Sequence, residues 1–240
     1  MKQKIVSSQV EEILETTEVR SDVSRRHFLQ LAGGIAGAGI LLAACKKSND
    51  DNTGKAPAGS SISVGSGDTG VLNYAYVLEQ LEAAFYERVV LSPYANISPD
   101  ELRLLTDIKD HEVAHREFYK TVLGSSAIAG INTDFSSINF SDRTSVLTAA
   151  RAFEDLGVSA YNGAGRLLQS STYLLMAGKI ASVESRHAAY LHDIISNGTF
   201  ADSSVVDNNG LDLSRTPAQV VAAASVYINN KIDVSNLPNI

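Results

Sequence analysis

A repeated set of metal-binding residue types constrains the fold of this chain more than any other feature. Each half of the C-terminal part carries one glutamate that is followed, further along the chain, by a Glu-x-x-His motif. On an α-helix, residues three apart share a face, so each motif places a carboxylate beside an imidazole. Four carboxylates and two imidazoles are the ligand set of a dinuclear metal site inside a four-helix bundle. The candidate ligands are Glu79, Glu112, His115, Glu154, Glu184 and His187.

Helical patterns cover the chain from residue 71 onwards. Apolar residues at helical spacing, without Pro or Gly, predict a first helix over residues 71–91. Ser98, Pro99 and Glu101 form a start signal, with an N-cap, a proline at the first helical position and a capping box. This signal predicts a second helix that ends at Leu123, before a glycine.

Two more long helices and one short helix are predicted in the second half. The third runs from residue 141 or 142 to about 168, although each glycine inside it costs about 1 kcal/mol relative to alanine. The fourth is predicted over residues 171–197 and ends before a glycine. A shorter fifth helix opens at Thr216-Pro217 and is predicted to reach about residue 230.

The lengths of the connections predict the topology. Short links join the first helix to the second and the third to the fourth, so each pair forms an antiparallel hairpin. Residues 125–140 form a longer link that could span about 50 Å, whereas a helix of about 24 residues is only about 36 Å long. The predicted fold class is therefore all-α: a ferritin-like four-helix bundle of two hairpins joined by a long crossover, plus a short C-terminal helix, over residues 71–240.

The two halves also repeat a tyrosine. The segment from Glu79 to Tyr86 aligns with the segment from Glu154 to Tyr161, and the two match at Glu, Leu and Tyr. These tyrosines lie two helical turns after their glutamates and share a face with them. We expect Tyr86 and Tyr161 beside the metal site, either as buried hydrogen-bond partners or as redox relays. A pseudo-twofold pair of half-sites suits two adjacent metal ions.

The N-terminal part reads as targeting and tethering sequence. Arg25 and Arg26 precede a weakly apolar run that contains glycine, which indicates a twin-arginine signal peptide over residues 1–44. The run ends in Leu-Ala-Ala-Cys, which resembles the lipobox, where cleavage precedes acylation of the cysteine, here Cys45. The polar segment 45–70 reads as a flexible tether. We therefore expect the twin-arginine translocase as a partner and an exported, lipid-anchored protein of the cell envelope, facing the periplasm or on the outer membrane.

Composition narrows the chemistry further. The formal net charge is -7 and the domain has no basic cluster, so nucleic acid is not an expected partner. Cys45 is the only cysteine of the chain, so no intrachain disulfide can form and the predicted bundle offers no thiolate to a soft metal. Carboxylate and imidazole ligands suit iron or manganese. We expect two Fe or Mn ions as the cofactor.

The motif segments resemble the ferritin-like domain family that includes exported and desiccation-related bacterial proteins. The resemblance is carried by residues 78–86 and 153–161 and by both Glu-x-x-His motifs, and it extends from about residue 71 to the C-terminus. In the wider superfamily the lone glutamates are terminal ligands, the Glu-x-x-His carboxylates bridge the metals, and the histidines cap them. The resemblance implies one half-site of Glu79, Glu112 and His115 and another of Glu154, Glu184 and His187. It also implies oxidation of ferrous iron, or reduction of oxygen or hydrogen peroxide.

Several alternatives stay open. Glu82, one turn after the first lone glutamate, is either a further ligand or a residue behind the ligands, although its counterpart in the second half is Gly157. His111 to His115 also matches the His-Glu-x-x-His motif of zinc proteases, but no third zinc ligand is apparent. Otherwise His111 and His192 are expected to face solvent or to lie behind the ligands. The metal could instead serve stability alone, in a non-catalytic stress or desiccation protein, and a homodimer is one open assembly.

Overall fold

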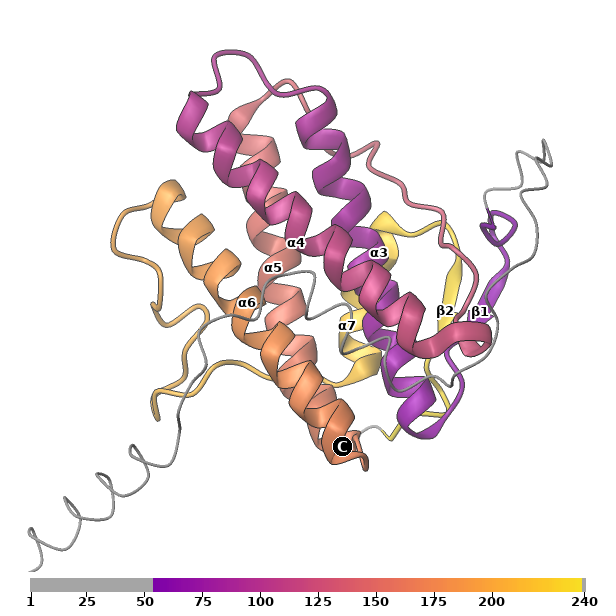
Figure 1. Cartoon of the computed structure of the whole chain (residues 1–240). Helices are drawn as coiled ribbons and strands as arrows, with labels where there is room; N and C mark the ends of the chain where they lie inside the picture. The colour runs from indigo at the N-terminus through magenta and orange to yellow at the C-terminus, as the bar shows by residue number, and fades with distance from the viewer. Residues whose placement is uncertain (1–53, 239–240) are drawn as a thin grey trace, which may run out of the picture. The chain divides into compact units, whose positions relative to one another are not determined.

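The computed structural model describes residues 54–238. Four long helices form one bundle: α3 (Gly67–Leu91), α4 (Pro99–Leu123), α5 (Arg143–Ala164) and α6 (Ser171–Ile195) (Figure 1). α3 packs along α4, α5 packs along α6, and the two hairpins meet through α3 and α5. The predicted all-α bundle of two hairpins is confirmed.

Side-chain caps set the starts of three of the long helices. Ser98, Asp142 and Ser170 each accept a hydrogen bond from the backbone N–H three residues further on, which satisfies a donor that the helix itself leaves free. The capping box predicted at Ser98 is only half formed. The carboxylate of Glu101 instead accepts a hydrogen bond from Nε of Arg143 at 2.9 Å. This contact ties the start of α5 to the start of α4.

Three helices end earlier than predicted. α5 stops at Ala164 and continues as a 3-10 turn, η2 (Gly165–Leu167), while α6 stops at Ile195. The fifth helix, α7 (Pro217–Ala224), begins with the predicted cap but passes into another 3-10 turn, η3 (Ser225–Tyr227). It does not reach residue 230, because Ile228 is already extended and pairs with the crossover at Thr133.

Two polar side chains of α3 hold the long crossover in place. After the 3-10 turn η1 (Gly124–Ser126), the link between α4 and α5 runs back along α3 (Figure 1). Oδ1 of Asn73 accepts a hydrogen bond from the backbone N–H of Ile128 at 3.0 Å. Oε1 of Gln80 accepts one from the backbone N–H of Ile131 at 3.0 Å. Buried polar groups on α3 therefore satisfy the crossover's backbone.

Aromatic packing joins the crossover to the bundle core. The rings of Phe85 on α3 and Phe153 on α5 meet edge to face, with centroids 5.0 Å apart. Phe135 of the crossover packs on Phe85, with a centroid separation of 5.9 Å. Edge-to-face pairs contribute about 0.5–1.5 kcal/mol beyond the area they bury. This cluster fixes α3 against α5 at one end of the bundle.

The segments that flank the bundle pair with each other, which corrects the predicted tether. β1 (Ser61–Ser63) and β2 (Lys231–Asp233) form a parallel two-stranded sheet in which Ile62 lies opposite Ile232. Ile62 and Val64 are buried in the core, and α3 already begins at Gly67. The prediction of a flexible tether as far as residue 70 is therefore wrong for its last part, because isolated apolar residues in a polar segment find partners from the far end of the chain.

No helix within residues 54–238 combines the length and the hydropathy needed to cross a membrane. The predicted signal peptide over residues 1–44, with Arg25 and Arg26, and the predicted lipidation site Cys45 lie outside the described residues.

Candidate metal centre

The six residues of the duplicated pattern come together in the centre of the bundle. α3 and α5 each contribute one glutamate, while α4 and α6 each contribute a Glu-x-x-His pair. The four glutamates are fully buried, and the two histidine side chains are 13% and 6% exposed. These residues are Glu79, Glu112, His115, Glu154, Glu184 and His187.

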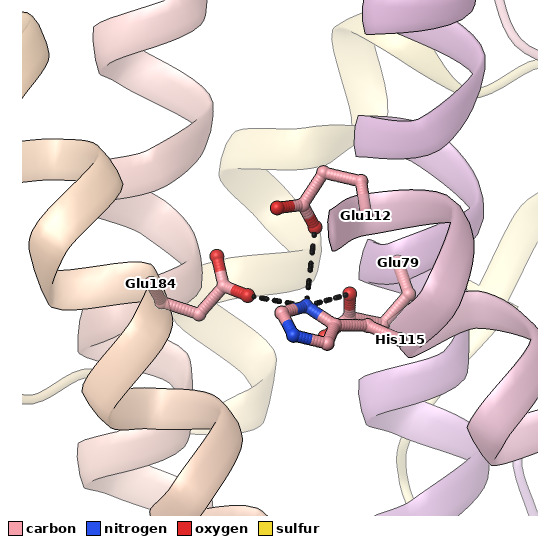
Figure 2. A group of neighbouring side chains, drawn as sticks. All are labelled: Glu79, Glu112, His115 and Glu184. Carbon is pink, nitrogen blue, oxygen red and sulfur yellow. Dashed lines mark ion pairs between the residues drawn. The ribbon is translucent and has the colours of Figure 1, made fainter. Parts of the chain in front are cut away.

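Two overlapping groups of these residues could each hold a metal ion. Within each group, one ligand atom from every residue lies within 4.8 Å of the others. The groups are Glu79, Glu112, His115 and Glu184, and Glu112, Glu154, Glu184 and His187. Figure 2 shows the first group, in which one imidazole faces three carboxylates. Both groups contain Glu112 and Glu184, so these two glutamates lie between the two candidate metal positions.

The shared carboxylates turn one oxygen toward each imidazole. Oε1 of Glu184 lies 2.8 Å from Nδ1 of His115, and its Oε2 lies 3.8 Å from Nδ1 of His187. Oε1 of Glu112 lies 3.0 Å from Nδ1 of His187, and its Oε2 lies 3.6 Å from Nδ1 of His115. Two ligand atoms at right angles on one ion, each bonded at about 2.1 Å, lie about 3.0 Å apart. The separations are thus those of atoms that could surround two ions.

The donor atoms at this centre lack hydrogen-bond partners. Both Nδ1 atoms and six oxygens of the four glutamates are buried and form no hydrogen bond among the described residues. Most buried polar atoms of proteins are hydrogen-bonded, and a buried carboxylate without compensation is costly. Cations between these atoms would satisfy them. The residues present therefore fit a metal pair in both donor chemistry and placement.

The pKa shifts at the centre also indicate that its buried carboxylates need compensating cations. Burial and the charge of Glu184 raise the pKa of Glu79 to about 8. Burial also raises the pKa of Glu154 well above its usual range. For His187, burial lowers the pKa but Glu154 and its neighbours outweigh it, and the pKa reaches about 12. Without cations, Glu79 and Glu154 hold protons themselves, while the imidazole of His187 stays charged.

Two tyrosines support the terminal glutamates, and each crosses to the other half. The hydroxyl of Tyr161 on α5 donates a hydrogen bond to Oε1 of Glu79 on α3. The hydroxyl of Tyr86 on α3 donates one to Oε1 of Glu154 on α5, at 2.6 Å. The expectation that both tyrosines lie beside the site as buried hydrogen-bond partners agrees with this geometry. Each bond leaves Oε2 of the glutamate facing an imidazole.

A third tyrosine extends this arrangement in one half only, and the sequence reasoning missed it. The hydroxyls of Tyr119 and Tyr161 lie 3.0 Å apart in the core. Since the single proton of Tyr161 goes to Glu79, Tyr119 is the donor to Tyr161. Tyr119 follows His115 by one helical turn, and this spacing could have revealed it. The position one turn after the second histidine is Leu191, which cannot form this bond.

The remaining histidines have different roles. Nδ1 of His111 lies 2.9 Å from Nε2 of His187, and their rings stack with centroids 5.1 Å apart. Such a contact orients a metal-ligating imidazole. It agrees with the expectation that His111 lies behind the ligands, where it contacts a ligand and not the metal. His111 belongs to neither group of candidate ligands, so the geometry does not support zinc shared by His111 and His115. His192 is neither exposed nor at the centre: it is buried and pairs with Asp155 at 2.9 Å.

The family comparison agrees with the fold and with the centre. A family model described as the ferritin-like domain matches residues 67–197. This range includes the four long helices and all six candidate ligands. No curated protein matches the chain in a sequence search. The chain belongs to the ferritin-like domain family.

Proposed function

We propose that this protein binds two iron or manganese ions and uses them to oxidise ferrous iron or to reduce oxygen or hydrogen peroxide. The observation that carries the proposal is the placement of Glu112 and Glu184, each with one oxygen toward each imidazole. A site for one ion needs no carboxylate that faces two positions. Four carboxylates also balance the charge of two divalent cations.

The donor set supports these metals and this class of reaction. Carboxylate oxygens and imidazole nitrogens suit Fe and Mn. Each position has four protein donors, which leaves coordination positions free on an octahedral ion. When bound, such a pair supplies electrons to oxygen or peroxide. The chain's part is to hold the ions: Tyr86 and Tyr161 orient the terminal glutamates, and His111 orients His187.

Metal loading and oxidation test the proposal. Metal analysis of protein purified from its own host should find about two ions per chain. Anaerobic addition of ferrous iron to apo-protein, followed by mixing with oxygen or peroxide, should produce near-ultraviolet absorbance of ferric iron faster than protein-free iron does. Glu112→Gln combined with Glu184→Gln should lose both binding and absorbance. No bound metal and no ferric absorbance in the natural sequence would remove the proposal.

A purely structural metal pair is a second candidate, favoured by the way α4 and α6 meet. His115 on α4 faces Glu184 on α6, and His187 on α6 faces Glu112 on α4. Metal ions here would join the two hairpins on the side away from the α3 and α5 contact. This role predicts that two ions raise the unfolding temperature while ferrous oxidation proceeds no faster than without protein.

We also propose export by the twin-arginine route and lipid anchoring at the cell envelope, on the strength of the N-terminal sequence. Replacing Arg25 and Arg26 by Lys should leave precursor in the cytoplasm. Replacing Cys45 by Ala should abolish labelling by a fatty-acid analogue. Normal export of the first variant, or normal labelling of the second, would refute the corresponding step.

A further inference from the structure

Glu82 is a fifth buried carboxylate beside the metal centre, and only the first half has it. It lies one turn after Glu79 on α3, whereas the position one turn after Glu154 on α5 is Gly157. The residue is 2% exposed, and its Oε2 atom has no hydrogen-bond partner among residues 54–238. A buried carboxylate is stable only when it is neutralised or paired.

Gly157 provides the space that Glu82 occupies. A Cβ atom at residue 157 would lie 2.9 Å from Oε1 of Glu82, closer than real Cβ contacts. The same Cβ atom would lie 3.8 Å from Oε2 of Glu184. That Oε2 atom is the oxygen that Glu184 turns toward His187. The carboxylate of Glu82 therefore crosses from α3 to the second half-site, as the hydroxyl of Tyr86 does.

We propose that Glu82 is a reserve ligand for the metal position that faces His187, and that residue 157 is glycine to admit it. Glu82 belongs to neither group of residues whose ligand atoms lie within 4.8 Å of one another. It would therefore reach the ion by rotation of its own side chain, while the six other ligands stay in place. This inference rests on the proposed dinuclear function and assigns unequal roles to the two metal positions.

The charge balance between the glutamates and the two metal ions explains why a fifth carboxylate would be useful. Four glutamates neutralise two divalent ions, so a fifth carboxylate is not needed before oxidation. Each ion that becomes trivalent adds one positive charge among buried glutamates, where uncompensated charge is costly. On binding, Glu82 would release to solvent the proton that neutralises it before oxidation, and would so supply one negative charge on the side of His187. The metal position facing His187 is then the one that better stabilises a trivalent ion.

The test is a redox titration of the iron-loaded protein, because it measures the ferric to ferrous equilibrium without relying on turnover. Glu82→Gln keeps the shape of the side chain and removes its charge. We expect this variant to bind two ferrous ions as the natural sequence does, with one iron made harder to oxidise by about tenfold in the equilibrium constant. For a one-electron couple, this is a rise of about 59 mV in midpoint potential. Glu87→Gln is the matched control, since Glu87 lies on the same helix with its side chain 47% exposed.

A second variant approaches the same contact from α5. Gly157→Ala retains Glu82 but places a methyl group against its Oε1 atom, so the same iron should again become harder to oxidise. Circular dichroism and ferrous stoichiometry establish that each variant is folded and loaded. If both variants bind two irons with the potentials of the natural sequence, the role of Glu82 is refuted and the dinuclear function stands. If the natural sequence itself does not bind two irons, the dinuclear function fails, and this inference fails with it.

Discussion

The hydroxyl of Tyr86 on α3 donates a 2.6 Å hydrogen bond to Oε1 of Glu154 on α5. Tyr161 repeats the relation in the opposite direction, from α5 to Glu79 on α3. Each half of the duplicated pattern therefore orients a glutamate of the other half. A change at one tyrosine is expected to act on the half-site across the bundle.

Tyr86→Phe should weaken metal binding without abolishing it. The variant leaves Oε1 of Glu154 buried without a donor, and residues that support a metal ligand typically contribute about tenfold to a hundredfold in affinity. Calorimetric titration of apo-protein with Mn²⁺ should show two ions bound, with affinity lower by about tenfold. Tyr190→Phe is the control, because Tyr190 is 51% exposed on α6. Equal affinities in the two variants would contradict a supporting role for Tyr86.

Tyr119 and Tyr161 should act as a unit. Tyr161→Phe removes both the donor to Glu79 and the acceptor for Tyr119, so Tyr119→Phe adds little in its presence. A double-mutant cycle on Mn²⁺ affinity should give a coupling energy of about 0.5–3 kcal/mol. Strictly additive effects would show that the two hydroxyls support the site independently.

The variant His111→Ala tests whether His111 binds the metal directly or only supports the ligand His187. The variant removes the contact to Nε2 of His187 but none of the atoms in the two ligand groups. We expect two ions still to bind, with affinity lower by about tenfold. A complete loss of metal from this single variant would instead favour the zinc-protease arrangement of His111 and His115.

The metal-free protein should lose stability as pH rises. The pKa of Glu79 is raised from 4.5 to about 8 by burial and by Glu184. A raised pKa means that the folded state holds the proton more tightly, so this stabilisation is full below about pH 4.5 and is lost as pH rises through about 8. His187, raised to about 12, acts in the same direction from 6.5 upwards.

The corresponding measurement is the urea midpoint of chelator-treated protein between about pH 5 and about pH 8. We expect the midpoint to fall across this range, and to fall less in Glu79→Gln, which has no proton to release there. Added Mn²⁺ should reverse the trend, because metal competes with protons for the same atoms. A midpoint of the metal-free protein that increases with pH would count against the buried, proton-holding carboxylates.

Two helical glycines provide a matched pair for stability. A Cβ atom at Gly163 on α5 would overlap the carbonyl oxygen of Arg215, whereas one at Gly178 on α6 would meet no atom within 4 Å. Gly163→Ala should lower the free energy of unfolding by about 1–3 kcal/mol through the clash. Gly178→Ala should raise it by about 0.4–1 kcal/mol. Urea unfolding measures both, and a neutral Gly163→Ala would mean that the segment at Arg215 does not pack on α5.

Local periodicity accounts for what could be predicted about this fold. The three-residue spacing of Glu112 and His115 places them on one face of α4, and the caps at Ser98 and Asp142 mark helix starts. Short links between consecutive helices force the helices into antiparallel hairpins, independently of side-chain identity. The pairing of Ile62 with Ile232 was missed because it joins distant parts of the chain through only a few residues, and no local pattern reports such a contact.

The sequence by itself determined the helices, the hairpins and the six candidate ligands, because these follow from residue type and from spacing along one helix. Beyond these ligands, the tertiary structure alone decided which residues meet across helices. Helical spacing puts Tyr86 on the face of Glu79, yet its hydroxyl reaches Glu154 because α3 packs against α5. The same packing brings Glu82 against Gly157. Contacts between helices depend on how their faces fit together, and spacing within one helix contains no information about the opposite face.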